Sequence, residues 1–213
     1  MKTSAAAFGS GEKIESLRRQ MFALFKGVPY NTHHIDHALR VERTCASIGI
    51  ELDADLATLR AAAILHDIAR INEVGDGRCH AARSAEIASG ILKEDGWAPL
   101  HIRSVAYAIR CHRYRSGIVP ETLEAKILQD ADRLDALGAI GIARVISHDP
   151  TRRLYDHWNC GDPFSGNCVT AHFFEKILKL RDTMHTSAAR KIAAKRHRYL
   201  VGYLQELKRE IFE

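Results

Sequence analysis

Apolar residues recur every three or four positions along most of the chain, which is the spacing of one face of an α-helix. In the N-terminal part they are Leu17, Met21, Leu24 and Phe25. The next two sets are Leu39, Val41, Cys45 and Ile48, followed by Leu56, Leu59, Ala62, Ala63 and His66. No segment of useful length alternates between apolar and polar residues, as a half-buried strand would. The pattern therefore predicts an all-α fold.

Further helical segments follow, separated by short turns. They are expected at 81–93, 100–112, 121–134, 136–146, 171–181 and 186 to about 211. Glycine or proline interrupts the pattern at 27–29, 74–77 and 116–120, which predicts turns at these positions. Residues 147–169 have no apolar period and hold two of the five prolines. A long irregular stretch of this kind is typical of a binding loop or a lid.

The length of 213 residues, of which 46% are hydrophobic and 27% charged, is enough for one globular domain. We expect a single helical domain over residues 1–213, with its core at about 29–146, the irregular loop at 147–169 and C-terminal helices at 170–211. No apolar run reaches the roughly 18 to 20 residues that a membrane helix needs. The first residues lack the apolar region of a secretory signal. The expected location is the cytoplasm, without a membrane partner.

The net charge of +5 raises the question of nucleic acid binding. Much of the excess lies after Lys176, where the cations are spaced through an amphipathic helix, as on a solvated helix face. Nucleic acid is therefore disfavoured as a partner. The five cysteines include no CxxC pair, so we expect free thiols and neither a disulfide framework nor a thiolate zinc site.

Three helical segments each carry acidic or imidazole side chains toward the predicted core. The segment AILHDIAR contains His66 and Asp67, NTHHIDHALRV contains His37, and LQDADRLDALG contains Asp130 and Asp132. A single buried His–Asp pair is usually explained by hydrogen bonding within the core. Three such segments together indicate a cation, because buried carboxylates and imidazoles are costly unless they are paired or bind one. Nitrogen and oxygen ligands suit Mn²⁺, Mg²⁺, Ni²⁺, Fe²⁺ or Zn²⁺.

In this order, the contexts HALRV, AAAILHDIAR and LQDADRLDALGAIGIAR resemble the HD-domain superfamily of metal-dependent phosphohydrolases. The likeness covers residues 29 to about 207 and is greatest to the compact single-domain bacterial type, YEDJ-like or YPGQ-like. It implies a helical bundle around a metal centre with one or two divalent ions. The implied ligands are His37, His66, Asp67 and Asp132.

The resemblance also implies roles for residues beyond these ligands. His80 and His112, at the ends of two predicted helices, would join Asp67 as catalytic residues and contact phosphate or a second ion. A solvent-facing His80 and a favourable helix-end charge at His112 are the structural alternatives. The resemblance implies that Lys176 and Lys179 bind the substrate's phosphate, and Arg113 is a further candidate because it is next to His112. Ordinary surface charge is the alternative for these three.

Two details depart from the family pattern or need a choice within it. The family's His-Asp pair just before His37 is replaced by His33 and His34, which puts the role of its outer acid in doubt. Asp130 and Asp132 lie about 200° apart on an α-helix, so they should not both face the metal. The context ADRL indicates that Asp132 is the metal ligand. Asp130 would then lie behind the ligands or at the surface.

The implied reaction is the attack of metal-activated water on a phosphate ester or nucleotide, and one version cleaves a nucleoside triphosphate to a monophosphate and pyrophosphate. The partner would be a small phosphorylated molecule, a nucleotide by resemblance, and assembly into a homo-oligomer is compatible with the sequence. Tyr155, Trp158 and Phe164 would either stack on a base or anchor their loop. The alternatives are a catalytically inactive nucleotide-sensing bundle, a helical module that binds nucleic acid through 191–198, and a purely structural bundle.

Overall fold

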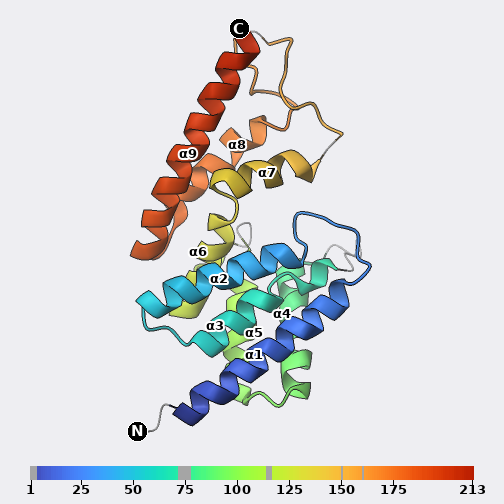
Figure 1. Cartoon of the computed structure of the whole chain (residues 1–213), viewed down its shortest axis with the longest axis vertical. Coiled ribbons are helices and arrows are strands. Elements are labelled where there is room, and N and C mark those ends of the chain that lie inside the picture. Colours follow the sequence, from blue (N-terminus) through green and yellow to red (C-terminus); the bar gives the residue numbers. More distant parts are fainter. Residues whose placement is uncertain (1–3, 72–77, 114–116, 150, 160) are drawn as a thin grey trace. The chain divides into compact units, whose positions relative to one another are not determined.

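The computed structural model describes residues 4–71, 78–113, 117–149, 151–159 and 161–213, and every regular element in these ranges is a helix (Figure 1). The all-α prediction is confirmed. The chain forms two compact units, residues 1–131 and 132–213. The turn expected at 74–77, the first residue of the turn expected at 116–120, and Cys160 lie outside the described residues. The remaining cysteines are free thiols, as expected.

The first unit is organised around helix α3 (Leu56–Leu65), which packs against four other helices. The helices of this unit are α1 (Ser4–Phe25), α2 (Ile35–Glu51), α3, α4 (His80–Glu94), α5 (Pro99–Cys111) and most of α6 (Leu123–Leu134). The run of three alanines in α3 is fully buried, because side chains this small let α1, α2 and α5 approach closely. Asp55 starts the helix by accepting hydrogen bonds from the backbone N–H groups of Ala57 and Thr58.

The chain leaves the helical conformation at the point where α3 ends, and this corrects one sequence-based expectation. The apolar pattern placed His66 and Asp67 on one continuous helix, about 100° apart. Instead, α3 stops at Leu65, Asp67 has φ −112° and ψ 17°, and a short 3-10 helix, η1 (Ile68–Arg70), follows. The His66 ring donates a hydrogen bond to the backbone carbonyl oxygen of Ala63 at 2.7 Å, taking one of the last carbonyls of the helix.

Helices α4, α5 and α6 lie within about two residues of their predicted bounds, but the helix predicted at 171–181 is divided. It consists of α8 (Ala171–Glu175) and the 3-10 helix η3 (Ile177–Thr183), separated at Lys176, which has φ −134°. Phe173, Ile177 and Leu180 are nevertheless buried. An apolar spacing of three and four is satisfied by either type of helix, so the period alone did not reveal the break.

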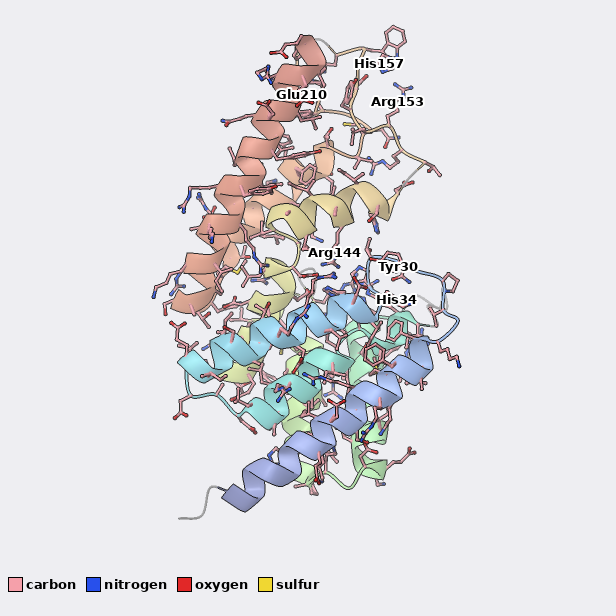
Figure 2. The ribbon with its side chains drawn as sticks, viewed as in Figure 1. Tyr30, His34, Arg144, Arg153, His157 and Glu210 are labelled. Carbon is pink, nitrogen blue, oxygen red and sulfur yellow. The ribbon has the colours of Figure 1, made fainter. Side chains whose placement is uncertain are left out.

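The second unit combines α7 (Gly138–His148), α8, η3 and the long α9 (Ser187–Phe212). The segment 147–169 is irregular, as predicted, and Arg153 and His157 project from it in Figure 2. Phe164 is buried and stacks on Phe174, whereas Trp158 is 77% exposed. Of the two roles considered for the loop aromatics, Phe164 therefore has that of an anchor. Among the described residues, no helix combines the length and the apolar character needed to cross a bilayer.

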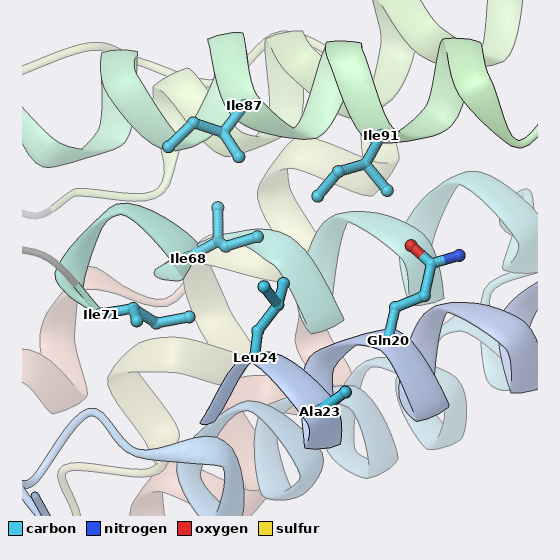
Figure 3. Close-up of a pocket in the computed structure, with 7 residues that line it drawn as sticks. All are labelled: Gln20, Ala23, Leu24, Ile68, Ile71, Ile87 and Ile91. Carbon is cyan, nitrogen blue, oxygen red and sulfur yellow. The ribbon is translucent and has the colours of Figure 1, made fainter. Parts of the chain in front are cut away.

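A cavity of about 560 Å³ lies in the first unit, between α1, η1 and α4 (Figure 3). Ile68, Ile87 and Ile91 contribute much of its apolar wall. The polar side chain in the wall is Gln20, whose amide donates hydrogen bonds to Asp95. A phosphorylated ligand needs cations or several N–H donors, whereas this wall is mostly apolar and its amide is directed at Asp95. The polar side chains of the same unit gather elsewhere, around Asp67.

Candidate metal centre

The carboxylate of Asp67 is 5% exposed and lies at the centre of a group of histidines in the first unit. The nearest ring nitrogens to its oxygens are His33 Nδ1 at 2.7 Å, His112 Nε2 at 3.5 Å, His80 Nε2 at 3.6 Å, His66 Nε2 at 3.7 Å and His37 Nε2 at 4.0 Å. These side chains come from the ends of α2, α3, α4 and α5 or from residues next to them. Helix packing thus gathers five imidazoles around one acid.

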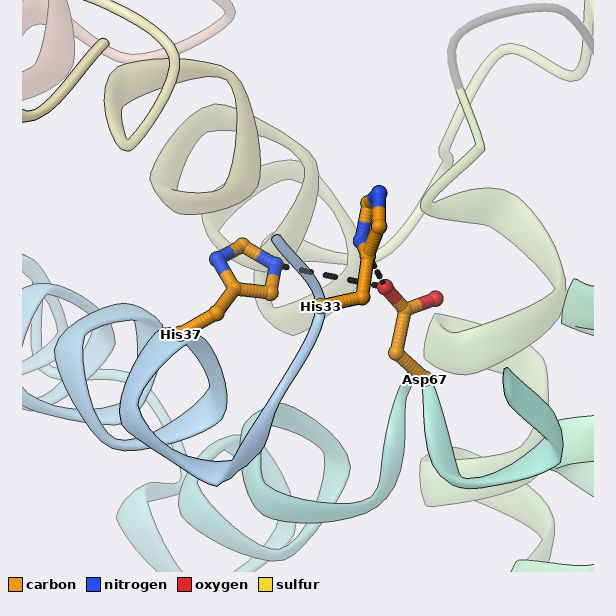
Figure 4. A group of neighbouring side chains, drawn as sticks. All are labelled: His33, His37 and Asp67. Carbon is orange, nitrogen blue, oxygen red and sulfur yellow. Dashed lines mark hydrogen bonds and ion pairs between the residues drawn. The ribbon is translucent and has the colours of Figure 1, made fainter. Parts of the chain in front are cut away.

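The two oxygens of Asp67 face different imidazoles. Oδ2 faces His33, His37 and His66. Oδ1 faces His80 and His112. Figure 4 shows His33 and His37 on the Oδ2 side, each joined to the carboxylate by a dashed line. One carboxylate therefore has two sides on which a positively charged group can be held.

His66 and His112 are oriented in the same way by the backbone. Each follows the last residue of its helix and donates Nδ1–H to a carbonyl oxygen three residues earlier, Ala63 at 2.7 Å and Ile109 at 2.6 Å. In the neutral ring this hydrogen bond leaves the Nε2 lone pair directed at the centre. The Nε2 atoms of His66 and His37 are 3.2 Å apart. Histidine ligands of metals commonly donate their other ring N–H to a carbonyl in this way.

The donor atoms fit a divalent transition metal ion. Within the first unit, two groups each have their possible ligand atoms within 4.8 Å of one another: His33, His37 and Asp67, and His66, Asp67 and His112. Both combine imidazole nitrogen with carboxylate oxygen, and neither contains a thiolate. Such a set suits Mn²⁺, Fe²⁺, Ni²⁺ or Zn²⁺.

The charges of the group also favour a cation. Burial opposes the ionisation of Asp67, but its interactions with His66, His112 and His33 outweigh burial and hold the pKa of this carboxyl well below its ordinary value. Burial lowers the pKa of His33, and burial together with the Arg70 guanidinium lowers the pKa of His80 to about 3. At neutral pH the acid is therefore charged and these two rings are neutral, so a cation need not displace protons from them.

Two arginines border the Oδ1 side of Asp67. Arg70 donates from Nε to Asp67 Oδ1 at 3.1 Å and from Nη2 to His80 Nε2 at 3.2 Å. Arg113 follows His112 and donates from Nη1 to the sulfur of Cys79 at 3.4 Å. Cys79 immediately precedes His80, so Arg113, one of the three residues expected to bind phosphate, lies beside this part of the group.

The structure brings together five of the residues for which the sequence suggested roles. They are His37, His66, Asp67, His80 and His112. The side chain of His80 is only 12% exposed, so the alternative that His80 faces solvent is wrong.

The other residues expected in the site stay predictions. Asp132 is half-buried and is the first residue of the second unit, and its role as a ligand stays a prediction. Lys176 is half-buried and Lys179 exposed, both in the second unit, and their contact with phosphate also stays a prediction. Asp130 is fully buried in the first unit, so a surface position for it is wrong.

His33 and Arg70 are the contributors that sequence reasoning missed. His33 was considered only as a departure from the family pattern, yet its ring is the nearest of the five to Asp67. The available signal was its closeness to His37 in the sequence, although His33 precedes α2, so helical spacing does not place its ring. Arg70 follows Asp67 by three residues in HDIAR, a spacing that allows an ion pair.

Comparison with known proteins gives consistent matches over most of the chain. The profile of the family described as HD domain matches residues 34–137. An uncharacterized protein of Bacillus subtilis (strain 168), YpgQ, is 33% identical over 181 residues, which is 84% of each chain. This extent of similarity is enough to assign a family.

Solved structures agree with this match. The structure of YpgQ in complex with ADP has a TM-score of 0.73, 28% identity, and coverage of 94% of this chain and 96% of that one. A predicted HD-superfamily hydrolase from an uncultured Thermotogales bacterium has a TM-score of 0.68 and 33% identity, with 92% and 91% covered. An HD-superfamily hydrolase from Bacillus thuringiensis has a TM-score of 0.74 and 30% identity, with 94% and 97% covered.

Proposed function

The chain belongs to the HD domain family, and on that premise we propose that it is a metal-dependent phosphohydrolase that acts on a nucleotide. The observation that carries the proposal is the buried Asp67 carboxylate with imidazole nitrogens on both of its oxygens. The similarity to proteins described as HD-superfamily hydrolases supports the class of enzyme. The ADP bound to YpgQ supports a nucleotide as the class of substrate.

His37, His66 and Asp67 would hold the cation, with Asp132 as the fourth ligand. When bound, a divalent cation supplies Lewis acidity, which activates water for attack on phosphorus and polarises a phosphoryl oxygen. The negative charge of Asp67 draws the cation to the buried centre, and the backbone hydrogen bond of His66 keeps its Nε2 directed there. We assign these residues to ion binding and water orientation.

His80 and His112 lie on the opposite edge of Asp67 and are assigned to the leaving side of the reaction. The backbone bond from His112 Nδ1 to Ile109 directs Nε2 toward the centre, where the ring would first take up a proton released by the attacking water and then deliver it from Nε2 to the leaving oxygen. Arg113, with Lys176 and Lys179, would neutralise the charge of the phosphate chain. For a nucleoside triphosphate, cleavage between the α- and β-phosphates would release a monophosphate and pyrophosphate.

The proposal is tested by turnover with metal-stripped protein. A panel of ribo- and deoxyribonucleoside triphosphates, diphosphates and monophosphates is incubated with Mn²⁺, Mg²⁺, Ni²⁺, Fe²⁺ or Zn²⁺, and released phosphate and pyrophosphate are measured. His66→Gln should abolish metal-dependent release. His101→Gln, at a site whose side chain is 40% exposed and pairs with Asp55, is the matched histidine control and should keep it.

The outcomes separate this proposal from its alternatives. Pyrophosphate release that needs metal and His66 supports a pyrophosphohydrolase, and phosphate release would indicate a phosphatase. Tight binding of metal and nucleotide without turnover would favour a nucleotide-sensing bundle. Absence of metal binding would overturn the proposal, because the imidazole and carboxylate group would then be structural.

A further inference from the structure

Arg70 connects the two polar groups on the Oδ1 side of the metal centre. One edge of its guanidinium donates to Asp67 and another nitrogen donates to His80, at 3.1 and 3.2 Å. Its side chain is 22% exposed, so most of it is enclosed by the protein. The residue sits on η1, the 3-10 helix that begins directly after Asp67. A single side chain thus contacts both an expected ion ligand and an expected catalytic histidine.

We propose that Arg70 is a positioning residue for the metal centre, which holds the carboxylate plane of Asp67 and selects the tautomer of His80. A guanidinium is planar and presents its N–H groups at fixed angles, so contact with two acceptors determines how each one is turned. An N–H donated to Nε2 requires a lone pair on that nitrogen, so the neutral His80 ring carries its proton on Nδ1.

The orientation of the Asp67 carboxylate matters because Asp67 is an expected ligand of the metal ion. His33 donates to Oδ2 at 2.7 Å while Arg70 donates to Oδ1 at 3.1 Å, so the acid is held from both oxygens. With both oxygens held, the remaining lone pairs are directed at the other imidazoles. Partners that orient a metal ligand in this manner typically contribute a factor of about 10 to 100 in metal affinity or activity. The inference deepens the proposed function and rests on it.

The alternative role for this arginine is direct binding of the substrate's phosphate. The two roles have different kinetic consequences. A positioning residue acts through Asp67 and His80, so its loss lowers kcat and metal affinity while KM for the nucleotide changes little. A phosphate-binding residue acts on substrate directly, so its loss raises KM and leaves metal affinity unchanged.

The experiment compares Arg70→Lys and Arg70→Gln with Arg60→Lys. Arg60 is the matched control, because it also pairs with a buried carboxylate, Glu42, and its side chain is 29% exposed. Mn²⁺ affinity is measured on the full chain by calorimetry and by the electron paramagnetic resonance signal of free Mn²⁺. The values of kcat and KM are measured with the nucleotide that the wild-type protein turns over. Circular dichroism and thermal melting check that each variant is folded.

We expect Arg70→Lys to weaken Mn²⁺ binding about tenfold and to lower kcat about 10- to 100-fold, with KM within about threefold of wild type. A lysine ammonium keeps the charge but cannot reproduce the planar, two-sided contact. Arg70→Gln should have an effect at least as large, while Arg60→Lys should leave metal affinity unchanged. A rise in KM with unchanged Mn²⁺ affinity and kcat, or no change in any of these quantities, would overturn the inference.

The Mn²⁺ affinity separates failure of this inference from failure of the proposed function. If the wild-type protein binds Mn²⁺ but turns over no nucleotide, the proposed reaction fails, and the role of Arg70 is still decided by the affinities of its two variants. If turnover is present and the variants bind Mn²⁺ like the wild type, the reaction stands and the positioning role is wrong. Should Arg70→Lys be unfolded, Arg70→Gln gives the same two readouts.

Discussion

The first unit contains several buried carboxylates, and two of them, Glu42 and Asp67, have different surroundings. Glu42, on α2, is 1% exposed and accepts hydrogen bonds from Arg18 Nη2 at 2.8 Å and Arg60 Nε at 2.5 Å. Asp67 is 5% exposed, and most of the groups around it are imidazoles. The two acids are similar in burial, so the difference lies in the partners that the fold provides.

This difference distinguishes a structural ion pair at Glu42 from the proposed metal site at Asp67. A guanidinium is charged at every physiological pH, so Glu42 has its counterions built in, and they tie α2 to α1 and α3. The rings of His33 and His80 are neutral at pH 7 because their pKa values are lowered. Asp67 has the guanidinium of Arg70 at Oδ1, but its other neighbours include imidazoles that direct nitrogen lone pairs at the same centre, and a carboxylate combined with imidazole nitrogens attracts a divalent cation.

The largest predicted effect is the loss of turnover in Asp67→Asn. The amide keeps the shape of the side chain but lacks its charge, so we expect metal-dependent nucleotide turnover to fall by about 1,000-fold or more. The measurement is product release at saturating metal and substrate. An Asp67→Asn protein with more than about a tenth of wild-type turnover would show that the carboxylate is structural, like Glu42.

The reverse change, Glu42→Ala, should act on stability and not on the metal site. It leaves Arg18 with Glu15 as its acidic partner and Arg60 without Glu42, and we expect a loss of about 3 kcal/mol in the free energy of unfolding, because a buried, doubly hydrogen-bonded carboxylate is lost from between three helices. Urea denaturation measures this loss, and Mn²⁺ titration at a temperature where the variant is folded should give the wild-type affinity. A weakened Mn²⁺ affinity would mean that the two carboxylates are coupled.

Metal addition should stabilise the folded protein only when the Asp67 carboxylate is present. At a free Mn²⁺ concentration of about 100 times Kd, the free energy of unfolding should rise by about 2.7 kcal/mol, because the ion binds the folded state. The same rise is expected for Glu42→Ala and none for Asp67→Asn. Thermal melting with and without chelator measures it, and equal stabilisation of all three proteins would place the ion elsewhere.

The smallest predicted effect for a single pH unit is the acid sensitivity contributed by His80 in the metal-free protein. The folded pKa of His80 is about 3, while an unfolded histidine titrates near 6.5, so the unfolded state binds the additional proton as pH falls. The contribution of this residue to stability is therefore complete above about pH 6.5 and is lost progressively down to about pH 3, by at most about 1.4 kcal/mol per pH unit. Urea denaturation at several pH values measures this loss.

His80→Gln should remove this part of the pH dependence. The matched variant His101→Gln removes a histidine whose side chain is 40% exposed and should keep the wild-type slope. Identical slopes for the two variants in chelator would contradict the assignment of the acid sensitivity to the His80 site.

Helix type and approximate bounds were predictable because they depend on local spacing. An apolar residue every three or four positions makes one helical face whatever the rest of the chain does, and α4 and α9 lie within about a residue of their predicted bounds. The breaks at Asp67 and Lys176 were not predictable, because the same spacing fits both an α-helix and a 3-10 helix.

The residues of the candidate site also divide into those that the sequence revealed and those that only the tertiary structure revealed. The sequence alone determined the all-α class and singled out His37, His66 and Asp67, whose role as cation ligands stays a prediction. Only the tertiary structure decided that His33 holds Oδ2 of Asp67 and Arg70 holds Oδ1, and that His80 and His112 also face Oδ1. The physical reason is that His33 and His112 lie 34 and 45 residues from Asp67 along the chain, and the packing of α3 against α2 and α5 brings their rings within 4 Å of its carboxylate.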